Sequence, residues 1–133
     1  MKLNFIIVDD RELDCFIAEK LILNTGKCNS FKAYDNAIEA LQDIKAKEPE
    51  KGSLTVLLLD IMMPVMNGFQ FIEEFENLPK ETKNNYRIIS ITTSLNKNDI
   101  SRISTYESVF GVLKKPYSFE AFEEMINNIS QES

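Results

Sequence analysis

The stretch VLLLDIMMPVMNG, residues 56–68, joins an apolar run to a carboxylate, a proline and a glycine. The apolar run, residues 54–59, has the length and composition of a strand that is buried on both faces of a parallel sheet. A charge inside such a strand would cost several kcal/mol, so we expect Asp60 to lie where the strand emerges from the core. The residues around it therefore predict a site that requires a negative charge.

Composition limits the size and class of the molecule. The chain has 133 residues, of which 44% are hydrophobic, a formal net charge of −6 and no histidine. This length suits one core and leaves no room for two, so we expect a single domain over residues 1–133 and no effector domain. The lack of a clustered basic surface argues against a nucleic-acid partner, because phosphates are neutralised by Lys and Arg.

Two further expectations concern location and thiols. No apolar segment approaches the roughly 18 residues of a membrane span, and residues 1–8 lack the features of a signal peptide, so we expect a cytoplasmic protein with no membrane partner. Cys15 and Cys28 have neither metal-ligand spacing nor a histidine to join them. We expect free thiols rather than a zinc site or a structural disulfide.

Apolar runs of strand length alternate with helical segments along the chain. The expected strands are residues 3–8, 31–34, 54–59, 86–91 and 109–113. Apolar residues at steps of three and four predict helices at residues 13–23, 38–44, 69–75, 97–106 and 119–129. Loops are expected near Gly26 and over residues 48–53 and 78–85. Five strands alternating with five helices predict an α/β fold, a doubly wound parallel sheet covered on both faces.

In the first expected helix, the residues that keep mostly to one face are Leu13, Phe16, Ile17, Lys20, Leu21 and Leu23. We expect this face to pack on the sheet.

Polar residues follow the carboxyl ends of the expected strands, where open parallel sheets bind their ligands. They are Asp9 and Asp10 after the first strand, Asp60 after the third, Thr92 and Thr93 after the fourth, and Lys114, Lys115 and Pro116 after the fifth. Asp35, after the second strand, is expected to be the N-cap of the next helix.

Three carboxylates and one ammonium at a common edge resist joint ionisation unless a cation joins them. Mg²⁺ prefers oxygen ligands and is usually held by one or two carboxylates together with water and a phosphate. We therefore expect a site for Mg²⁺ and a phosphoryl group, with Asp60 as the nucleophile that forms an aspartyl phosphate. Thr92 could donate its hydroxyl and Lys115 its charge to the phosphoryl oxygens.

Most of these residues also have a simpler interpretation. Asp9 and Asp10 could only cap a helix, Thr92 could be only a strand former, and Lys115 could be a solvated surface residue. For Asp60 the simpler interpretation is weak, because a carboxylate that closes an apolar strand is neither a cap nor part of a polar face.

Four motifs, in this order, resemble those of the CheY-like response regulator receiver domains of two-component signal transduction. IIVDD resembles the acidic pair after the first strand, LLLDIMMPVMNG the phosphoacceptor strand and its continuation, ISITTS the switch threonine, and LKKP the lysine–proline pair. The resemblance extends over nearly the full chain. It implies a flavodoxin-like sheet with strand order 2-1-3-4-5.

The resemblance implies a phosphoacceptor and a metal site. Asp60 is expected to accept the phosphoryl group. Mg²⁺ or Mn²⁺ is expected to be held by Asp10 directly, by Asp9 largely through water, and by Asp60 and the backbone carbonyl of Met62.

The resemblance also implies roles at the ends of the fourth and fifth strands. Thr92 is expected to move to the phosphoryl oxygen, and Lys115 to pair with Asp60 or its phosphate. A cis peptide bond is expected before Pro116. The family often has Tyr or Phe three residues before this lysine; here that position is Val112, for which Phe110, with the same strand parity, could substitute.

These expectations describe a stand-alone signalling module rather than an enzyme. Because the chain has no histidine, the phosphoryl group must come from a sensor histidine kinase, a histidine phosphotransfer protein or a small phosphodonor. The resemblance implies a downstream protein target that binds the fourth helix, fifth strand and fifth helix, residues 97–129. A monomer or weak dimer is expected, and self-dephosphorylation is expected to be slow because Met62 and Ser94, which flank the water's approach in the family, orient water poorly.

Two other functions are alternatives to this one. An aspartyl-phosphate hydrolase of the haloacid dehalogenase type would have a second Asp two residues after the nucleophile, and here that residue is Met62. A flavodoxin-like cofactor binder would need a phosphate loop after the first strand, where VDDRELD would repel an anion.

Overall fold

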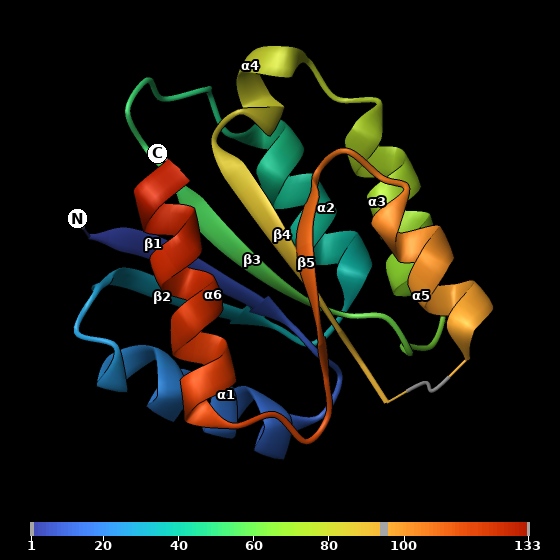
Figure 1. Ribbon diagram of the computed structural model, residues 1–133. Coiled ribbons are helices and arrows are strands. Elements are labelled where there is room, and N and C mark those ends of the chain that lie inside the picture. The colour runs from blue at the N-terminus through green and yellow to red at the C-terminus, as the bar shows by residue number, and fades with distance from the viewer. Residues whose placement is uncertain (1, 94–95, 133) are drawn as a thin grey trace.

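The computed structural model describes residues 2–93 and 96–132. These residues form a five-stranded, all-parallel sheet in the order β2-β1-β3-β4-β5 (Figure 1). The strands are β1 (Leu3–Val8), β2 (Cys28–Tyr34), β3 (Thr55–Asp60), β4 (Tyr86–Thr92) and β5 (Val109–Lys114). The predicted α/β class, the parallel sheet and its strand order are confirmed.

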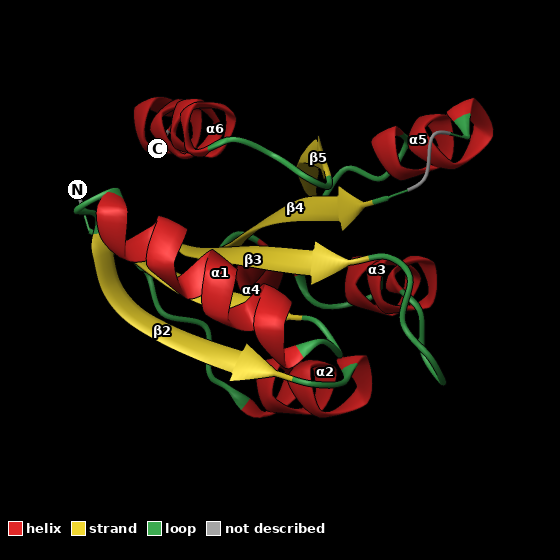
Figure 2. Ribbon diagram, turned by 90° about the horizontal axis from the view of Figure 1, so that it is seen from below, coloured by secondary structure: helices red, strands yellow, loops and turns green. Residues whose placement is uncertain are grey.

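Helices connect successive strands and cover both faces of the sheet. They are α1 (Glu12–Asn24), α2 (Ala37–Ala46), α3 (Gly68–Glu76), α4 (Lys80–Lys83), α5 (Lys97–Ser104) and α6 (Phe119–Glu132). α1 and α6 lie on one face, and α2, α3 and α5 lie on the other (Figure 2).

The described residues contain six helices, one more than the five that were predicted. The additional helix, α4, is a single turn that begins after Pro79 inside the segment expected to be a loop. Four residues are too few to show a helical period, so pattern alone missed it. The fourth and fifth predicted helices correspond to α5 and α6.

Each face of the sheet has its own apolar core. One cluster joins α2, α3 and α5 to the sheet, and the other joins α1 and α6 to it. β3 separates the two clusters, and all six of its residues are buried. The continuous apolar run of residues 54–59 therefore belongs to the central strand, and Asp60 is the last residue of that strand.

The expected packing face of α1 is wrong. Leu13, Phe16 and Leu23 are 68%, 54% and 54% exposed, and the residues of α1 that are buried are Ala18 and Ile22. Apolar side chains surround this helix on most sides, so their spacing does not select one face. Ala18 and Ile22 pack on the sheet, whereas Leu13, Phe16 and Leu23 remain in solvent.

The strand parity that suggested Phe110 as a substitute for Val112 is not found. The pairing of β4 with β5 shifts between Ile88 and Ile89, so that one extra residue of β5 lies between the partners of these two residues. Such a bulge breaks the alternation of side chains along a strand. Phe110 therefore packs with the cluster of α1 and α6, whereas Val112 packs with the cluster of α2, α3 and α5.

A smaller correction concerns the start of α2. Its N-cap is Asn36, whose side chain accepts a hydrogen bond of 2.8 Å from the Glu39 backbone N–H. Asp35, the expected cap, accepts from the Asn36 side chain instead. One residue of error is typical at helix ends.

In the described part of the chain, no helix combines the length and the apolar character that crossing a membrane requires. Cys15 and Cys28 are free thiols, as expected.

Candidate functional site

The carboxyl ends of β1, β3, β4 and β5 bring the predicted site residues to one edge of the sheet. Asp9, Asp60 and Thr92 are buried there, and Asp10 is exposed. One carboxylate oxygen from each of Asp9, Asp10 and Asp60 lies within 4.8 Å of the others. The three aspartates that were predicted as a cluster are therefore together in space.

Asp60 lies in an environment that disfavours its charge. Burial raises the pKa of this carboxyl to about 6, and the neighbouring Asp9 and Asp10 add to the rise. Two groups oppose it: the Lys115 ammonium, 3.9 Å from Asp60 Oδ2, and the Met62 backbone N–H, which donates a 3.1 Å hydrogen bond to Oδ1. Without a cation, this side chain is a poorly stabilised anion at neutral pH.

The loop after β3 is held in place by the start of α3. Gly68, the first residue of α3, donates a 2.9 Å backbone hydrogen bond to the Ile61 carbonyl. A Cβ at this position would lie 2.6 Å from Ile61 Cα, so only glycine allows the approach. Asn67 and Gln70 form a capping box at the same helix end, which fixes where α3 begins.

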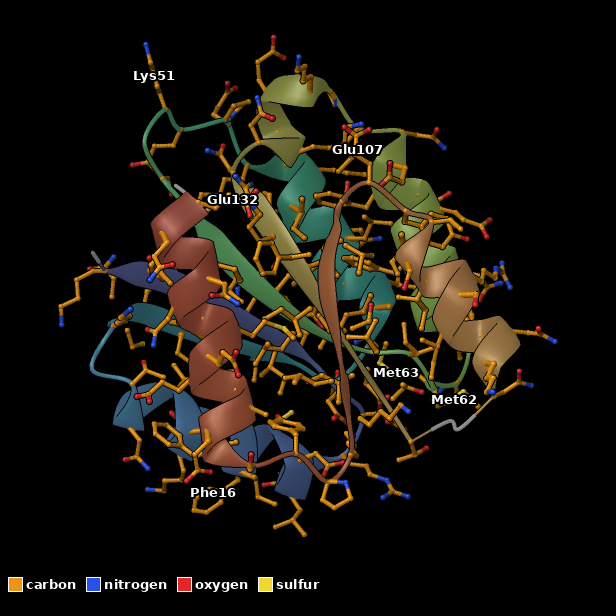
Figure 3. All side chains as sticks on the ribbon, in the orientation of Figure 1. Phe16, Lys51, Met62, Met63, Glu107 and Glu132 are labelled. Carbon is orange, nitrogen blue, oxygen red and sulfur yellow. The ribbon has the colours of Figure 1, made fainter. Side chains whose placement is uncertain are left out.

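Three methionines follow β3, and they differ in exposure. The side chain of Met62 is 63% exposed, whereas Met63 is buried and Met66 packs partly against the core. Figure 3 shows Met62 and Met63 in the loop between β3 and α3. Met63 and Met66 are thus packing residues, and Met62 faces solvent beside Asp60.

Lys115 follows β5 and reaches across the edge of the sheet toward α1. Its backbone N–H donates to the Thr92 carbonyl at 2.9 Å, and its peptide bond to Pro116 is cis, as the sequence predicted. Its ammonium donates hydrogen bonds of 3.0 Å to Asp9 and 2.9 Å to Asp14. Burial lowers the pKa of this ammonium, but the hydrogen bonds to Asp14 and Asp9 outweigh burial and the pKa is raised.

Asp14 was not among the predicted site residues. It lies in the first turn of α1, and its side chain is 24% exposed. Its spacing from Asp10 gave no signal, because Asp10 precedes α1 and only residues within a helix share a face at a spacing of four. The sequence also could not indicate its partner, Lys115, which is 101 residues away in the chain.

The fourth strand contributes a buried threonine. Thr92 is the last residue of β4 and is 1% exposed, whereas Thr93 is exposed. Ser94, expected beside the water's approach, lies outside the described residues.

A hollow of about 360 Å³ lies between the acidic cluster, α1 and the segment after β5. Its lining includes the charged residues Asp9, Asp14 and Lys115 and the apolar residues Ile17 and Leu21. Ile17 is also 46% exposed, so the apolar surface of α1 is continuous with the charged site.

The donor atoms at this edge suit a hard divalent cation. All three clustered residues offer carboxylate oxygens, and neither cysteine belongs to the cluster. Mg²⁺ binds such oxygen sets and neutralises the mutual repulsion of the carboxylates. The residues present therefore fit Mg²⁺.

The doubly wound sheet, in the order β2-β1-β3-β4-β5 and with an acidic carboxyl edge, has the flavodoxin-like fold. A family model described as the response regulator receiver domain matches residues 5–127, and the chain belongs to this family. Receiver domains are signalling modules of two-component systems, and the family typically binds Mg²⁺.

Solved structures agree with this assignment. A response regulator receiver protein from Dyadobacter fermentans is 29% identical, with a TM-score of 0.83 over 95% of this chain and 96% of that chain. A two-component response regulator from Cytophaga hutchinsonii is 19% identical, with a TM-score of 0.86 over 98% of this chain and 99% of the other. Chemotaxis protein CheY4 of Vibrio cholerae is 21% identical, with a TM-score of 0.75 over 97% and 99%. The last two show likeness of fold.

A curated relative is much longer than this chain. The autoinducer 1 sensor kinase/phosphatase LuxN of Vibrio campbellii is 27% identical over 123 residues, which is 92% of this chain and 13% of LuxN. The similarity therefore concerns one segment of that protein.

Proposed function

We propose that this receiver domain accepts a phosphoryl group on Asp60, with Mg²⁺ bound, from a phosphohistidine of a partner protein. The observation that carries the proposal is the meeting of three carboxylates at the carboxyl edge of the sheet, with the Lys115 ammonium 3.9 Å from Asp60. The chain contains no histidine, so a phosphohistidine donor must lie outside these 133 residues.

Asp60 is the nucleophile in this proposal. One of its carboxylate oxygens attacks phosphorus, a new O–P bond forms, and the N–P bond to the donor imidazole breaks as that ring takes up a proton. Asp60 must be ionised to react, although its surroundings raise the pKa to about 6. Mg²⁺, when bound, neutralises the negative charge that would otherwise repel the phosphoryl group.

The remaining residues of the site bind the cation or contact the phosphoryl oxygens. Asp10, Asp60 and the Met62 carbonyl hold the cation, and Asp9 acts largely through water. After transfer, Thr92 donates its hydroxyl and Lys115 its charge to the phosphoryl oxygens. Both side chains extend from strand ends that adjoin the acidic cluster, which supports these roles.

The exposed apolar face of α1 is proposed to contact the phosphodonor protein. Exposed apolar surface beside a charged pocket is typical of sites that bind proteins. Here Ile17 and Leu21 line the same hollow as Asp9 and Lys115, so a partner that covers α1 would also reach the site. The downstream target is proposed to bind at the β5 edge of the sheet, on α5, β5 and α6.

A hydrolase of the haloacid dehalogenase type is not favoured. Its second aspartate would stand at position 62, where the side chain is an exposed methionine.

The deciding experiment is intact mass spectrometry of the purified protein with acetyl phosphate. We expect the addition of one phosphoryl group with Mg²⁺, none in excess chelator, and none in Asp60→Asn. The matched control is Asp35→Asn, which changes an exposed aspartate after the neighbouring strand β2 and should be phosphorylated normally. Full phosphorylation of Asp60→Asn, or of the wild type in chelator, contradicts the proposal.

The partner side of the proposal has its own test. With a histidine kinase that phosphorylates the wild-type protein, Ile17→Ala should slow transfer, and acetyl phosphate should still phosphorylate this variant at the normal rate. Leu23→Ala is the control, because Leu23 is also exposed but lies at the far end of α1. Equal transfer rates in both variants would exclude this face of α1 as the donor contact.

A further inference from the structure

Lys115 is shared among three carboxylates, and Asp60 is the most distant of them. Its ammonium lies 2.9 Å from Asp14, 3.0 Å from Asp9 and 3.9 Å from Asp60. The two shorter contacts are hydrogen bonds, and the third is too long to be one. Before phosphorylation the lysine is therefore bound on the α1 side of the site.

Asp14 differs from the other two carboxylates in its position. Asp9 and Asp60 belong to the cluster that fits the cation, whereas Asp14 does not. It is attached to α1, which Ala18 and Ile22 fix to the sheet. Asp14 thus offers Lys115 a fixed partner that binding of a cation by the cluster would leave in place.

Lys115 cannot form its strongest contacts with Asp14 and with a phosphoryl group on Asp60 at the same time. A phosphoryl group on Asp60 would present new oxygen acceptors beyond the carboxylate, and an ammonium that turns toward them would weaken its contact with Asp14 on the α1 side. Holding the lysine at Asp14 also leaves Asp60 less fully paired, and so more available to a cation.

We propose that Asp14 is a positioning residue that holds Lys115 away from Asp60 and thereby sets the balance between cation binding and phosphoryl binding. This inference rests on the proposed function, because it concerns the same cation and the same phosphoryl group. It predicts that removal of the Asp14 charge has opposite effects on the two ligands. A purely structural role, in which Asp14 only attaches α1 to the segment after β5, predicts lower stability without opposite effects.

The test measures two ligands with Asp14→Asn. Mg²⁺ affinity, measured by titration calorimetry, should weaken about fivefold, because the released lysine pairs with Asp60 and competes with the cation. Affinity for beryllofluoride, a phosphoryl mimic followed by ¹⁹F NMR at saturating Mg²⁺, should strengthen about fivefold, because the same lysine reaches the mimic more readily. Glu12→Gln is the matched control, since it removes one charge from an exposed residue of the same helical turn.

A double-mutant cycle separates positioning from plain charge repulsion. In a Lys115→Met background, Asp14→Asn should no longer weaken Mg²⁺ binding by more than about twofold. Equal weakening with and without the lysine overturns the positioning role. Asp14→Ser, which also removes the charge, provides a second variant, and thermal melting shows whether each protein is folded.

The outcomes for the two proposals are distinct. Wild-type protein that binds neither Mg²⁺ nor beryllofluoride overturns the proposed function, and this inference with it. Normal binding by the wild type, with no change or with changes of the same sign in Asp14→Asn, overturns this inference alone.

Discussion

At Asp60, burial in the fold favours a neutral side chain, whereas the proposed site requires a carboxylate. Asp60 closes a fully buried strand, and its side chain lies within reach of two further carboxylates. Burial and these neighbours raise its pKa from 3.8 to about 6, so the folded protein without metal binds a proton at Asp60 more tightly than the unfolded chain does. At neutral pH the charged Asp60 side chain therefore lowers the stability of the folded protein until a cation binds.

This cost predicts a pH-dependent stability in the presence of chelator. A carboxyl whose folded pKa is raised stabilises the fold most below its unfolded pKa of 3.8, and this contribution is lost as the pH rises through about 6. Asp60→Asn removes the titrating group. At pH 7 the variant should be more stable than the wild type, by up to about 3 kcal/mol, and the difference should shrink as the pH falls from 7 to 4.

Urea denaturation at several pH values measures this difference. Asp35→Asn is the control, and its stability relative to the wild type should not follow the same curve. If the advantage of Asp60→Asn is the same at pH 4 and pH 7, burial of the Asp60 charge is not its cause.

Met62 is the residue on which the lifetime of the phosphorylated state is expected to depend. Hydrolysis of an aspartyl phosphate needs a water held in line with phosphorus, and a thioether is a poor partner for that water. Replacement of Met62 by Asn, whose amide can orient water, should speed the loss of phosphate roughly 3- to 10-fold. Intact mass measured over time on the phosphorylated, purified protein gives the rate.

Val65→Asn is the matched control for Met62→Asn. Val65 lies in the same loop, is 87% exposed and has a positive φ of 69°, which Asn accepts more readily than Val. Its decay rate should equal that of the wild type. Unchanged or slower decay in Met62→Asn would mean that water access past this side chain does not limit the lifetime.

At the scale of the element, the start of α3 determines where Asp60 lies. Gly68 packs directly on the backbone of Ile61, the residue that follows Asp60. Position 68 therefore requires glycine because α3 lies very close to the loop after Asp60. The torsion angles of Gly68 alone do not explain the requirement.

Gly68→Ala should lower the free energy of unfolding by about 1–3 kcal/mol and slow phosphorylation of Asp60, because the backbone of Ile61 must move. Gly111→Ala is the control: its Cβ would meet only the flexible end of Met125, at 3.0 Å. Urea denaturation and phosphorylation with acetyl phosphate measure the two effects. A Gly68→Ala protein as stable and as reactive as Gly111→Ala would show that the approach is not needed.

At the scale of the whole molecule, the proposed output surface is connected to the site through β4 and β5. α5 is also attached to α3: Arg102 forms a 2.7 Å ion pair with Glu73, and its guanidinium lies 4.2 Å from the centre of the Phe69 ring. Tyr106 donates a further hydrogen bond of 3.0 Å to Glu73. These contacts are exposed and therefore individually weak, so α5 can change its arrangement at low cost.

Binding of beryllofluoride with Mg²⁺ should change amide hydrogen exchange on α5, β5 and α6. The contact between Thr92 and the phosphoryl mimic is expected to shift the population of two arrangements of this surface. We expect a small change, because Val112 stands at the usual aromatic position and the bulge directs Phe110 to the opposite face. The free protein with Mg²⁺ alone is the reference, and changes confined to other elements would refute the location of the output surface.

Some properties of the whole molecule stay predictions. They include the cytoplasmic location and the monomeric or weakly dimeric state. A partner bound through α5, β5 and α6 would provide the output.

The sequence by itself determined the strands, their parallel arrangement and the gathering of Asp9, Asp10, Asp60, Thr92 and Lys115 at one edge. Apolar runs identify buried strands, and the carboxyl ends of parallel strands lie together. These features follow from local pattern and topology alone. The cis bond before Pro116 was implied by the resemblance of the lysine–proline pair to the family motif.

Only the tertiary structure decided which side of α1 is buried, where Phe110 packs and which groups surround Lys115. The period of an apolar helix does not select a face, and a bulge reverses side-chain direction within one strand. The contact of Asp14 with Lys115 joins residues 101 positions apart. Such contacts depend on how closely two elements approach and on the charges that meet there, and neither quantity is encoded in a local pattern.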